Sequence, residues 1–471
     1  MPAMSVLPAR DPSKRKAGLR RFAPSDLSAP QLLVGSFALL IASGTLGFAV
    51  LPGLWIGPRP GFVDALFMAT SAVCVTGLSV VDVSSQLTFF GQLWLLLLIQ
   101  LGGLGILTIA ALAAAALGRR TSLEVEEAAA GPSNLLPEAG PRALVRAVIV
   151  ATLVIEAIGA VSLWAAWVPS LGAAGAVWPA VFHAISAFCN AGFSTFSNGL
   201  AGHATHLPTL GIVAALLLLG GIGFLVMEDL RANVRGRRRR VTLHTRIVLV
   251  TSGILIAVAL PLFLFFEWDH TLADMSLPVR IANAFFMAVT PRTAGFNTVD
   301  YEQIANPSVF LTVALMYIGG SPGSTAGGVK TTTAALLALG LWARLRGRSD
   351  VSLANRSIPE ATLQRATGLA VGAILVLFAF VFALLWTELE REGVDTDRGR
   401  FVRLVFEAQS ALGTVGLSMN MSSELTPAGR LLIVALMFIG RVGPLALLES
   451  MARRSRRKQP YRLGREDILV G

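Results

Sequence analysis

The chain has 471 residues, of which 54% are hydrophobic and only 14% are charged, and its mean hydropathy is +0.67. A soluble domain carries about 25% charged residues, so this composition excludes most soluble proteins and all intrinsically disordered ones. The net charge of +11 does not indicate a nucleic-acid binder, because long apolar runs separate the cations, and two cysteines are too few for a disulfide scaffold.

The polar N-terminus leads into a series of apolar runs. Residues 1–30 hold six cations, and no short apolar region with a cleavage site follows, so we expect no cleaved signal peptide. A membrane span needs about 20 apolar residues. We interpret eight runs as transmembrane helices: 31–54, 88–117, 145–168, 208–227, 246–266, 307–341, 367–386 and 429–448.

Shorter, half-apolar segments lie between the members of each pair of runs, at 61–78, 178–193, 281–296 and 402–417. They are too short and too polar to cross a bilayer. Re-entrant segments of this kind are tolerated in a membrane only where protein or a water-filled cavity surrounds them. We therefore expect four pore loops.

The four segments are copies of one motif. They read FMATSAVCVTGLS, FHAISAFCNAGFS, FFMAVTPRTAGFN and FEAQSALGTVGLS, and align without gaps so that Phe67, Phe182, Phe285 and Phe406 each precede a glycine by ten residues. The runs that follow them repeat as well, as QLGGLG, LLGGIG, YIGGSPG and FIGRVG. Such self-similarity predicts an all-α integral membrane fold of four tandem span–pore loop–span repeats, with eight transmembrane helices around a pseudo-fourfold pore.

This repeat divides the chain into nine expected parts. They are the N-terminal tail 1–30, repeat 1 at 31–117, a linker 118–144, repeat 2 at 145–230, a basic linker 231–245, repeat 3 at 246–341 with an intramembrane loop 319–333, a linker 342–366, repeat 4 at 367–448 and the C-terminal tail 449–471.

The charges indicate the orientation of the chain. The segments 1–30, 118–146, 228–246, 341–365 and 449–471 together hold 29 cations and 13 anions, whereas the remainder is net negative. Cytoplasmic loops of membrane proteins carry an excess of Lys and Arg. We therefore expect a multi-pass protein of the cytoplasmic (inner) membrane, with both termini cytoplasmic and the pore loops facing outside.

The glycine of each copy lies in a stretch suited to binding a cation. A cation that crosses a bilayer exchanges its water for oxygens, and rings of backbone carbonyls supply them. Glycine makes the required backbone dihedrals inexpensive. The alternative, glycines that only allow close helix packing, explains one copy better than four. The candidate filter segments, which would bind K⁺, are Val75, Thr76, Gly77 and Leu78; Asn190, Ala191, Gly192 and Phe193; Thr293, Ala294, Gly295 and Phe296; and Thr414, Val415, Gly416 and Leu417.

The run at 307–341 is interrupted by GGSPGSTAGGVKTTT, which holds five glycines and a proline, residues that helix interiors disfavour. It is not a nucleotide-binding P-loop, because Gly-Gly-Val-Lys-Thr stands where that motif needs Gly-Lys-Ser/Thr and no strand precedes it.

These motifs resemble those of the Trk/Ktr/HKT superfamily of potassium transporters over about residues 31–471. The resemblance is greatest to the KtrB membrane subunit, and the C-terminal sequence EDILVG is similar to the ending of that subunit. The resemblance implies potassium uptake, often aided by sodium, by a homodimer with one pore in each protomer. It also implies a cytoplasmic ring of KtrA-like subunits that bind ATP or ADP, with no covalently bound cofactor in this chain.

The resemblance further implies an intramembrane gate below the filter. Its residues here are Gly319, Gly320, Ser321, Pro322, Gly323, Ser324, Thr325, Ala326, Gly327, Gly328 and Lys330, together with Arg441 in the fourth repeat.

Two cations in the apolar part of the chain have alternative interpretations. Arg441 occupies the place of a glycine in the other repeats, so we expect a barrier to cations, with a structural ion pair as the alternative. The resemblance suggests a C-terminal carboxylate as its partner. Lys330 is interpreted as a gating residue, as the partner of a carboxylate, or as a side chain that reaches the cytoplasmic face.

Four further residues have simpler expected roles. Glu156 lies within a span and is expected to form a buried pair. Asp64 is expected to cap a helix, His183 to pack, and Arg292 either to brace its filter segment or to form a salt bridge at the mouth.

Other functions are weighed against this interpretation. A secondary cation transporter with a midplane site usually has two repeats, and a proton-linked Trk-type transporter or a potassium-pump subunit would have a longer chain. No zinc spacing, nucleophile motif or pair of catalytic carboxylates indicates an enzyme. The sequence leaves open the role of sodium, the degree of K⁺ selectivity and the regulatory nucleotide.

Overall fold

A computed structural model describes residues 29–104, 141–236, 240–348, 350–353, 356–389 and 398–443. This part of the chain is predominantly helical, as predicted, and contains one short antiparallel pair, β1 (Ser352–Leu353) and β2 (Arg356–Ser357). Much of the expected cytoplasmic sequence, including both tails, most of the linker 118–144 and the basic residues 237–239, lies outside the described residues.

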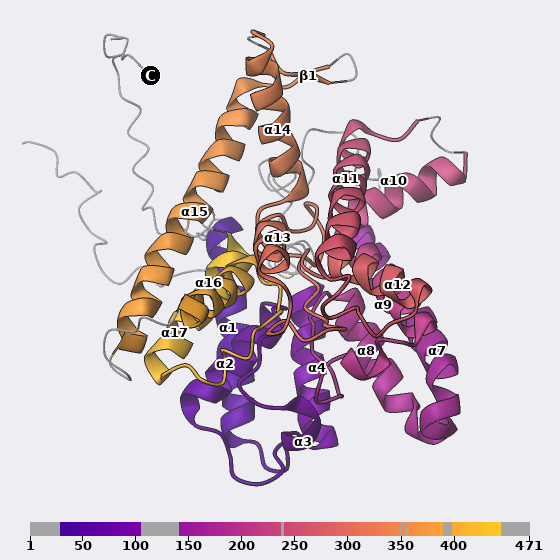
Figure 1. Cartoon of the computed structure of the whole chain (residues 1–471), viewed down its shortest axis with the longest axis vertical. Helices are drawn as coiled ribbons and strands as arrows, with labels where there is room; N and C mark the ends of the chain where they lie inside the picture. Colours follow the sequence, from indigo (N-terminus) through magenta and orange to yellow (C-terminus); the bar gives the residue numbers. More distant parts are fainter. Residues whose placement is uncertain are drawn as a thin grey trace, which may run out of the picture.

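Each repeat consists of a long apolar helix, a short pore helix and the helices of the predicted second span (Figure 1). The elements are α1 (Ala29–Val50), α2 (Phe62–Val73), α3 (Val83–Gln86) and α4 (Phe89–Gly103) in repeat 1; α7 (Pro141–Gly175), α8 (Val177–Phe188), η3 (Ala201–His203), α9 (Leu207–Ile222) and α10 (Phe224–Val234) in repeat 2; α11 (Leu243–Phe266), α12 (Leu277–Val289), α13 (Asn306–Tyr317) and α14 (Thr331–Leu345) in repeat 3; and α15 (Glu360–Leu389), α16 (Arg398–Gly413) and α17 (Pro427–Val442) in repeat 4.

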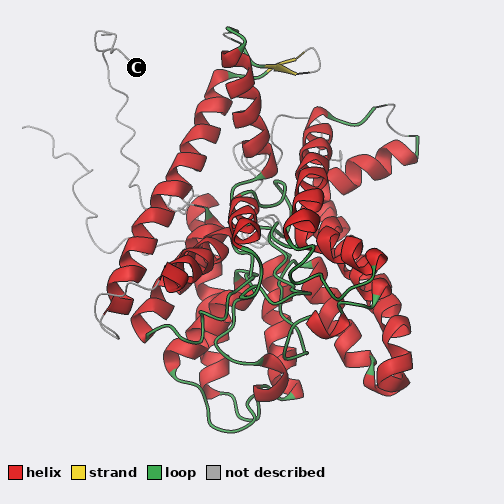
Figure 2. Ribbon diagram, viewed as in Figure 1, coloured by secondary structure: helices red, strands yellow, loops and turns green. Residues whose placement is uncertain are grey.

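The repeats close into a ring because the second span of each one packs against the pore helix of the next. The contacts run from α4 to α8, from α9 to α12, from α13 to α16, and finally from α17 back to α2. Figure 2 shows the loops that follow the pore helices gathered inside this ring of helices. The fold therefore has the pseudo-fourfold arrangement that the sequence repeat predicts.

The buried phenylalanine at the start of the motif reveals a difference in the third repeat. Phe67, Phe182 and Phe406 are fully buried ten residues before their glycines, but in repeat 3 the fully buried residue is Phe286, nine residues before Gly295. Phe285, which the gapless alignment selects, is half-exposed. The buried phenylalanine of the third repeat is thus one residue closer to its glycine than in the other three repeats, so the gapless alignment is wrong over this pore helix.

Within the part of the chain that the structure describes, four helices are long and apolar enough to cross a membrane, namely α1, α7, α11 and α15. The run expected at 208–227 is not straight, because α9 ends at Ile222 and α10 departs at 98°. Gly223, between them, has φ +88°, which a residue with a side chain rarely adopts. The number of eight spans stays a prediction, since α4 and α17 end at the edge of the described residues.

Large apolar side chains cover the outside of the ring. On α15, Phe378, Phe382 and Trp386 are each about 70% exposed, which in water would be an aggregation-prone surface. A hydrocarbon environment satisfies such a face, while the helices satisfy their own backbone hydrogen bonds.

Candidate functional site

The four candidate filter segments meet backbone to backbone in the middle of the ring. Their glycines lie so close together that a methyl group on one would collide with the backbone of the next repeat. In chain order, a methyl group on Gly77 would meet the Ala191 carbonyl, one on Gly192 the Gly295 Cα at 2.9 Å, one on Gly295 the Val415 carbonyl, and one on Gly416 the Thr76 carbonyl. The contacts form a closed cycle of four.

All four segments share an unusual backbone conformation. The glycines have φ between +70° and +96°, and the residues two positions earlier, which are not glycines, are also left-handed. These residues are Val75 (φ +55°), Asn190 (+58°), Thr293 (+68°) and Thr414 (+49°). Left-handed backbone costs a residue with a side chain about 1–2 kcal/mol. Left-handed backbone at every second position differs from both helix and strand, and it allows successive carbonyl oxygens to face the same side.

The last turn of each pore helix holds its own segment through a hydroxyl group. Ser71 accepts from the Gly77 N–H at 3.1 Å, Ser410 accepts from the Gly416 N–H at 3.0 Å, Ser186 donates to the Phe193 carbonyl at 2.8 Å, and Thr290 donates to the Phe296 carbonyl at 2.5 Å. Thr290 aligns with the three serines only if the alignment of the third pore helix is shifted by one residue, and the burial of Phe286 requires the same shift.

Three threonines in these segments have buried hydroxyl oxygens without a hydrogen-bond partner in the described part of the chain. They are Thr76, Thr293 and Thr414. Buried polar atoms are rarely left unpaired in proteins, so each unpaired oxygen needs an explanation. Oxygen atoms of this kind beside a ring of carbonyls are the ligands that an alkali cation takes when it loses its water.

The interruption between α13 and α14 is a folded loop rather than a stretch of helix. It spans 318–330, and Thr331 begins α14, so the last three residues of the predicted interruption are helical. The ends of the loop are closed by hydrogen bonds from the Gly319 N–H to the Val329 carbonyl at 2.8 Å and from the Thr331 N–H to the Gly320 carbonyl at 3.0 Å.

The loop is attached to repeat 2 at the point where α9 bends. The Ser321 N–H donates to the Gly221 carbonyl, and the Phe224 N–H donates to the Gly323 carbonyl, both at 3.0 Å. Pro322 lies between these two attachments, and the hydroxyl of Ser324 donates back to the Ser321 carbonyl at 2.7 Å.

The loop also touches two of the candidate filter segments. The Thr325 hydroxyl lies 3.0 Å from the side-chain amide of Asn190, and a methyl group on Gly327 would collide with the side chain of Thr414. Ala326 is buried beside this contact, and Gly328 follows it with φ +64°. The loop therefore lies directly against the ring of segments.

Arg441 ties this loop to the first repeat. Its guanidinium is 6% exposed and donates to the Thr325 carbonyl in the loop and, at 2.6 Å, to the Gly102 carbonyl at the end of α4. No carboxylate lies within 4.0 Å of it among the described residues, and the C-terminal carboxylate suggested as its partner lies outside them. A cationic side chain thus links repeats 4, 3 and 1 at the loop.

Lys330 turns back onto the same loop. Its ammonium donates to the Ala326 carbonyl at 2.6 Å and reaches the Gly327 carbonyl at 3.4 Å. None of the ion pairs within the described part of the chain includes it. Arg441 and Lys330 therefore both hold carbonyls of the same three-residue stretch, 325–327.

The other singled-out residues lie around the ring. Glu156 accepts from the Gln100 amide at 3.0 Å, as expected for a buried pair, and Arg292 donates to the Ser252 hydroxyl on α11 at 2.9 Å, as expected for a brace. The expectation for Asp64 is wrong, because it lies in the first turn of α2 and forms an ion pair with Arg430 at 2.5 Å, whereas Gly61 is the N-cap.

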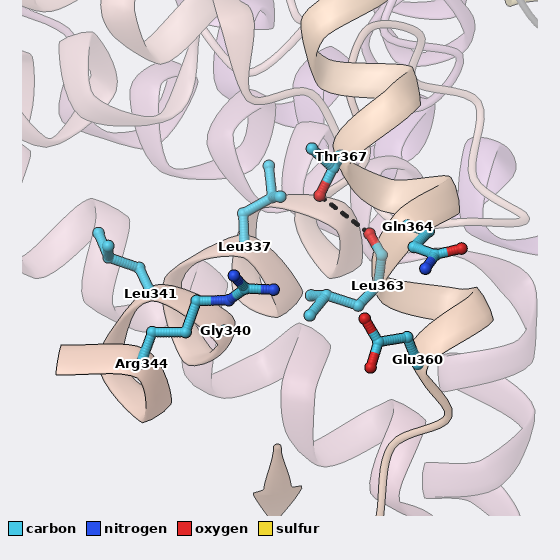
Figure 3. Close-up of a pocket in the computed structure, with 8 residues that line it drawn as sticks. All are labelled: Leu337, Gly340, Leu341, Arg344, Glu360, Leu363, Gln364 and Thr367. Carbon is cyan, nitrogen blue, oxygen red and sulfur yellow. Dashed lines mark hydrogen bonds between the residues drawn. The ribbon is translucent and has the colours of Figure 1, made fainter. Parts of the chain in front are cut away.

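Figure 3 shows a hollow elsewhere, between α14 and α15, with a volume of about 460 Å³. Its lining consists of Leu337, Gly340, Leu341, Arg344, Glu360, Leu363, Gln364 and Thr367. None of these residues belongs to the candidate filter segments or to the loop, so this hollow is not part of the candidate site.

The sequence interpretation missed the hydroxyl anchors and the left-handed residues. The signal for the anchors is present, since Ser71, Ser186 and Ser410 each precede their glycine by six residues. The gapless alignment hid the fourth member, because it places Val289 in this position and Thr290 one residue later.

Comparison with known proteins identifies relatives over nearly the whole chain. Residues 38–455 match the model of the TrkH family, described as cation transport protein. The chain is 36% identical to the potassium/sodium uptake protein NtpJ of Enterococcus hirae, over 94% of this chain and 98% of that protein. It is 37% identical to the Ktr system potassium uptake protein B of Bacillus subtilis, over 92% of this chain and 94% of that protein.

A solved structure has the same fold. The crystal structure of the potassium transporter TrkH from Vibrio parahaemolyticus aligns with a TM-score of 0.70 at 20% identity, over 92% of this chain and 87% of that one.

Proposed function

The chain belongs to the TrkH family of cation transport proteins, and from this premise we propose that it carries potassium into the cell through a gated pore. It is a multi-pass protein of the cell membrane and an ion transporter, not an enzyme. Two relatives that match more than nine-tenths of the chain are named as a potassium/sodium uptake protein and a potassium uptake protein.

The observation that carries the proposal is the closed cycle of four left-handed segments. In this proposal, the 16 residues of the candidate filter segments line the narrowest part of the pore and bind K⁺ through backbone carbonyls, with the unpaired hydroxyls of Thr76, Thr293 and Thr414 beside them. Because the side chains next to the glycines differ among the repeats, the carbonyl cage is less regular than one built from four identical loops.

The loop 319–330 is the proposed gate. It touches Asn190 and Thr414, and its backbone is held by Arg441 and Lys330, so a change in these contacts would move it relative to the filter. Arg441 also places a buried positive charge next to the loop, which raises the energy of a cation at that depth.

The remaining parts of the proposal concern assembly and regulation. The protein forms a homodimer in the lipid bilayer of the cytoplasmic membrane, with both termini and the linkers between the repeats in the cytoplasm. A ring of KtrA-like subunits, which bind ATP or ADP, controls the gate, and Na⁺ acts with K⁺ in uptake. The similarity to the Ktr system potassium uptake protein B of Bacillus subtilis supports the proposal of a partner subunit, because that name describes one component of a system.

Potassium-limited growth tests the proposed transport. A host without its own potassium uptake systems should grow at low K⁺ when it expresses this chain, and it should grow faster when a KtrA-like subunit is added. The absence of rescue in every combination, with the protein demonstrated in the membrane, would contradict the proposal.

The gate is tested by shortening the loop. Deletion of the four residues 324–327 removes Thr325, and with it the contact with Asn190 and the carbonyl that Arg441 holds. We expect a higher rate of Rb⁺ influx without the regulatory subunit. An unchanged rate with an unchanged amount of protein would exclude the loop as a barrier.

A further inference from the structure

One residue of each pore helix directly follows the buried phenylalanine. In repeats 1, 2 and 4 its side chain contacts the residue two positions after the candidate filter glycine, and repeat 3 has Met287 and Asn297 at the corresponding positions. We call these four combinations the post-filter pairs, and they are Met68 with Ser79, His183 with Ser194, Met287 with Asn297, and Glu407 with Ser418.

The pairs in repeats 1 and 3 are held weakly. The Met68 sulfur lies 3.3 Å from the Ser79 hydroxyl, which also donates to the Val81 carbonyl. In repeat 3, the Asn297 amide donates to the Val299 carbonyl at 3.4 Å and makes no hydrogen bond to Met287. A thioether is a poor acceptor, so neither methionine fixes its partner.

The pair in repeat 2 is held by a directional hydrogen bond. His183 is fully buried, and its Nδ1 lies 2.8 Å from the Pro179 carbonyl, which only accepts. In the neutral ring Nδ1 therefore carries the hydrogen, and Nε2 accepts from the Ser194 hydroxyl at 2.9 Å. The same serine oxygen accepts from the Phe196 N–H at 2.9 Å, so His183 fixes the start of the following loop.

The pair in repeat 4 is held most strongly. Glu407 is fully buried, and its carboxylate accepts from the Ser418 hydroxyl at 2.8 Å and from the Ser422 hydroxyl. Asn420 has φ +57°, and this left-handed turn returns the chain to the carboxylate. None of the ion pairs within the described ranges includes Glu407, and the two serine hydroxyls are its donors there.

We propose that Glu407 and His183 are positioning residues that set ion selectivity, because they fix the far ends of two filter segments while methionines leave the other two looser. The fourth segment is thereby held at both ends, by the Ser410 hydroxyl at Gly416 and by Glu407 at Ser418. This inference rests on the proposed function, since it concerns discrimination between K⁺ and Na⁺ by the same filter.

A purely structural role for these two side chains does not explain the pattern. The same position is filled by methionine in two of the four repeats, so the fold does not require a polar group there. A polar side chain buried at this position is costly unless its hydrogen bonds serve a purpose. Rigid spacing of the carbonyl oxygens is one such purpose, because selectivity depends on the number and arrangement of the ligands that replace water.

The test uses methionine as the natural occupant of the position. The variants Glu407→Met and His183→Met are compared with Met287→Leu, which changes a position without a hydrogen bond, and with Ser423→Ala, which removes an exposed hydroxyl next to Ser422. Rb⁺ uptake is measured in cells or proteoliposomes, with the KM for K⁺, the maximal rate and the inhibition by Na⁺ determined separately.

We expect the KM for K⁺ to rise by about threefold to tenfold in Glu407→Met and less in His183→Met, with a parallel loss of K⁺ over Na⁺ discrimination, since buried hydrogen bonds are lost. Ser418→Ala, which removes one donor and leaves the carboxylate, should shift the KM in the same direction. Both controls should keep the wild-type KM and discrimination.

The outcomes separate the hypotheses. A fall in maximal rate and protein amount, with unchanged KM and unchanged discrimination in Ser418→Ala and Glu407→Met, would assign these residues to stability and overturn the inference. Equal loss of discrimination in Met287→Leu would overturn it as well. A wild-type protein that carries no K⁺ would contradict the proposed function itself.

Discussion

A methyl group has room at Gly172 but not at Gly295, although the two glycines have nearly the same φ of +73° and +75°. Gly172 lies in the kink of α7, and a methyl carbon added there has nothing within 4 Å. A methyl carbon added at Gly295 would collide with the Val415 carbonyl and lie 3.1 and 3.2 Å from the Cα atoms of Gly192 and Gly416. At the residue scale, the filter glycines therefore satisfy two separate requirements, one of conformation and one of space.

This pair of glycines provides a matched prediction. Gly172→Ala and Gly295→Ala both place a side chain on backbone with positive φ, a strain of about 1–3 kcal/mol, but only the second also crowds the candidate filter. We expect the KM for K⁺ to rise by at least about tenfold in Gly295→Ala, equivalent to about 1.4 kcal/mol of lost ion binding, and to stay near wild type in Gly172→Ala. The measurement is Rb⁺ uptake at equal protein amounts.

Wild-type uptake kinetics in both alanine variants would remove Gly295 from the ion path. Equal loss in both would show that backbone strain alone, wherever it lies in the chain, is what the transporter fails to tolerate.

The sequence was sufficient to predict that the four motif glycines belong to one site, because four copies of one motif in register are easy to recognise. It was not sufficient to find the left-handed residues before them. Val75, Asn190, Thr293 and Thr414 have no chemical feature in common, and their backbone is imposed by the neighbouring repeats and not by local preference. Glu407 was missed for a related reason, since its partners follow it by 11 to 15 residues.

At the element scale, the helices are joined at their ends by buried polar contacts. Glu388, near the end of α15, is 4% exposed and accepts from both the backbone N–H and the hydroxyl of Thr426, which is the N-cap of α17. Arg400 on α16 lies 3.7 Å from the same carboxylate. One side chain thus holds the three helices of the fourth repeat together.

Removal of this carboxylate should loosen the fourth repeat. We expect Glu388→Gln to lower the free energy of unfolding by about 1–3 kcal/mol, because it removes the charge that faces Arg400 and replaces one accepting oxygen with an NH2 donor beside the buried Thr426 N–H. The exposed ion pair of Glu302 with Arg403 is the control, and Glu302→Gln should cost less than about 1 kcal/mol. Denaturation of the purified protein in detergent measures both, and a smaller effect at Glu388 would contradict this description.

Element boundaries were predicted less well than element types. The sequence shows the repeated Gly-Gly motif at the end of the second spans, but not that Gly223 breaks the helix, because an isolated glycine is tolerated within a helix. The loop 319–330 binds to the carbonyls and amides freed by this bend. The bend in repeat 2 and the loop of repeat 3 are therefore one structure, which no analysis of either segment alone would reveal.

At the scale of the whole molecule, the ring is closed between the last repeat and the first. The packing of α17 against α2 includes the ion pair of Arg430 with Asp64, which are 366 residues apart. The repeat in the sequence predicted a ring, but it could not predict which spans would contact which pore helices, since four equivalent units have no preferred partner until they are packed.

The orientation of this ring in the membrane is a further prediction. Cys74 and Cys189 are buried, so new cysteines at exposed positions can be labelled against a low background. We expect Ser85→Cys, on the side of the pore loops, to react with a membrane-impermeant maleimide in intact cells. Arg235→Cys, which follows α10, should react only after the membrane is opened. The reverse pattern would invert the proposed topology.

The ring is built from one polypeptide, and this has a consequence for how its selectivity changes during evolution. In a pore made of four identical subunits, every substitution is present in all four subunits, so a change near the axis alters all four quarters of the pore together. Here each quadrant is encoded separately, and a mutation alters one quarter of the cage while three quarters stay intact. Ion preference can therefore drift in small steps, and the unlike residues Met68, His183, Met287 and Glu407 are the kind of record that such independent drift leaves.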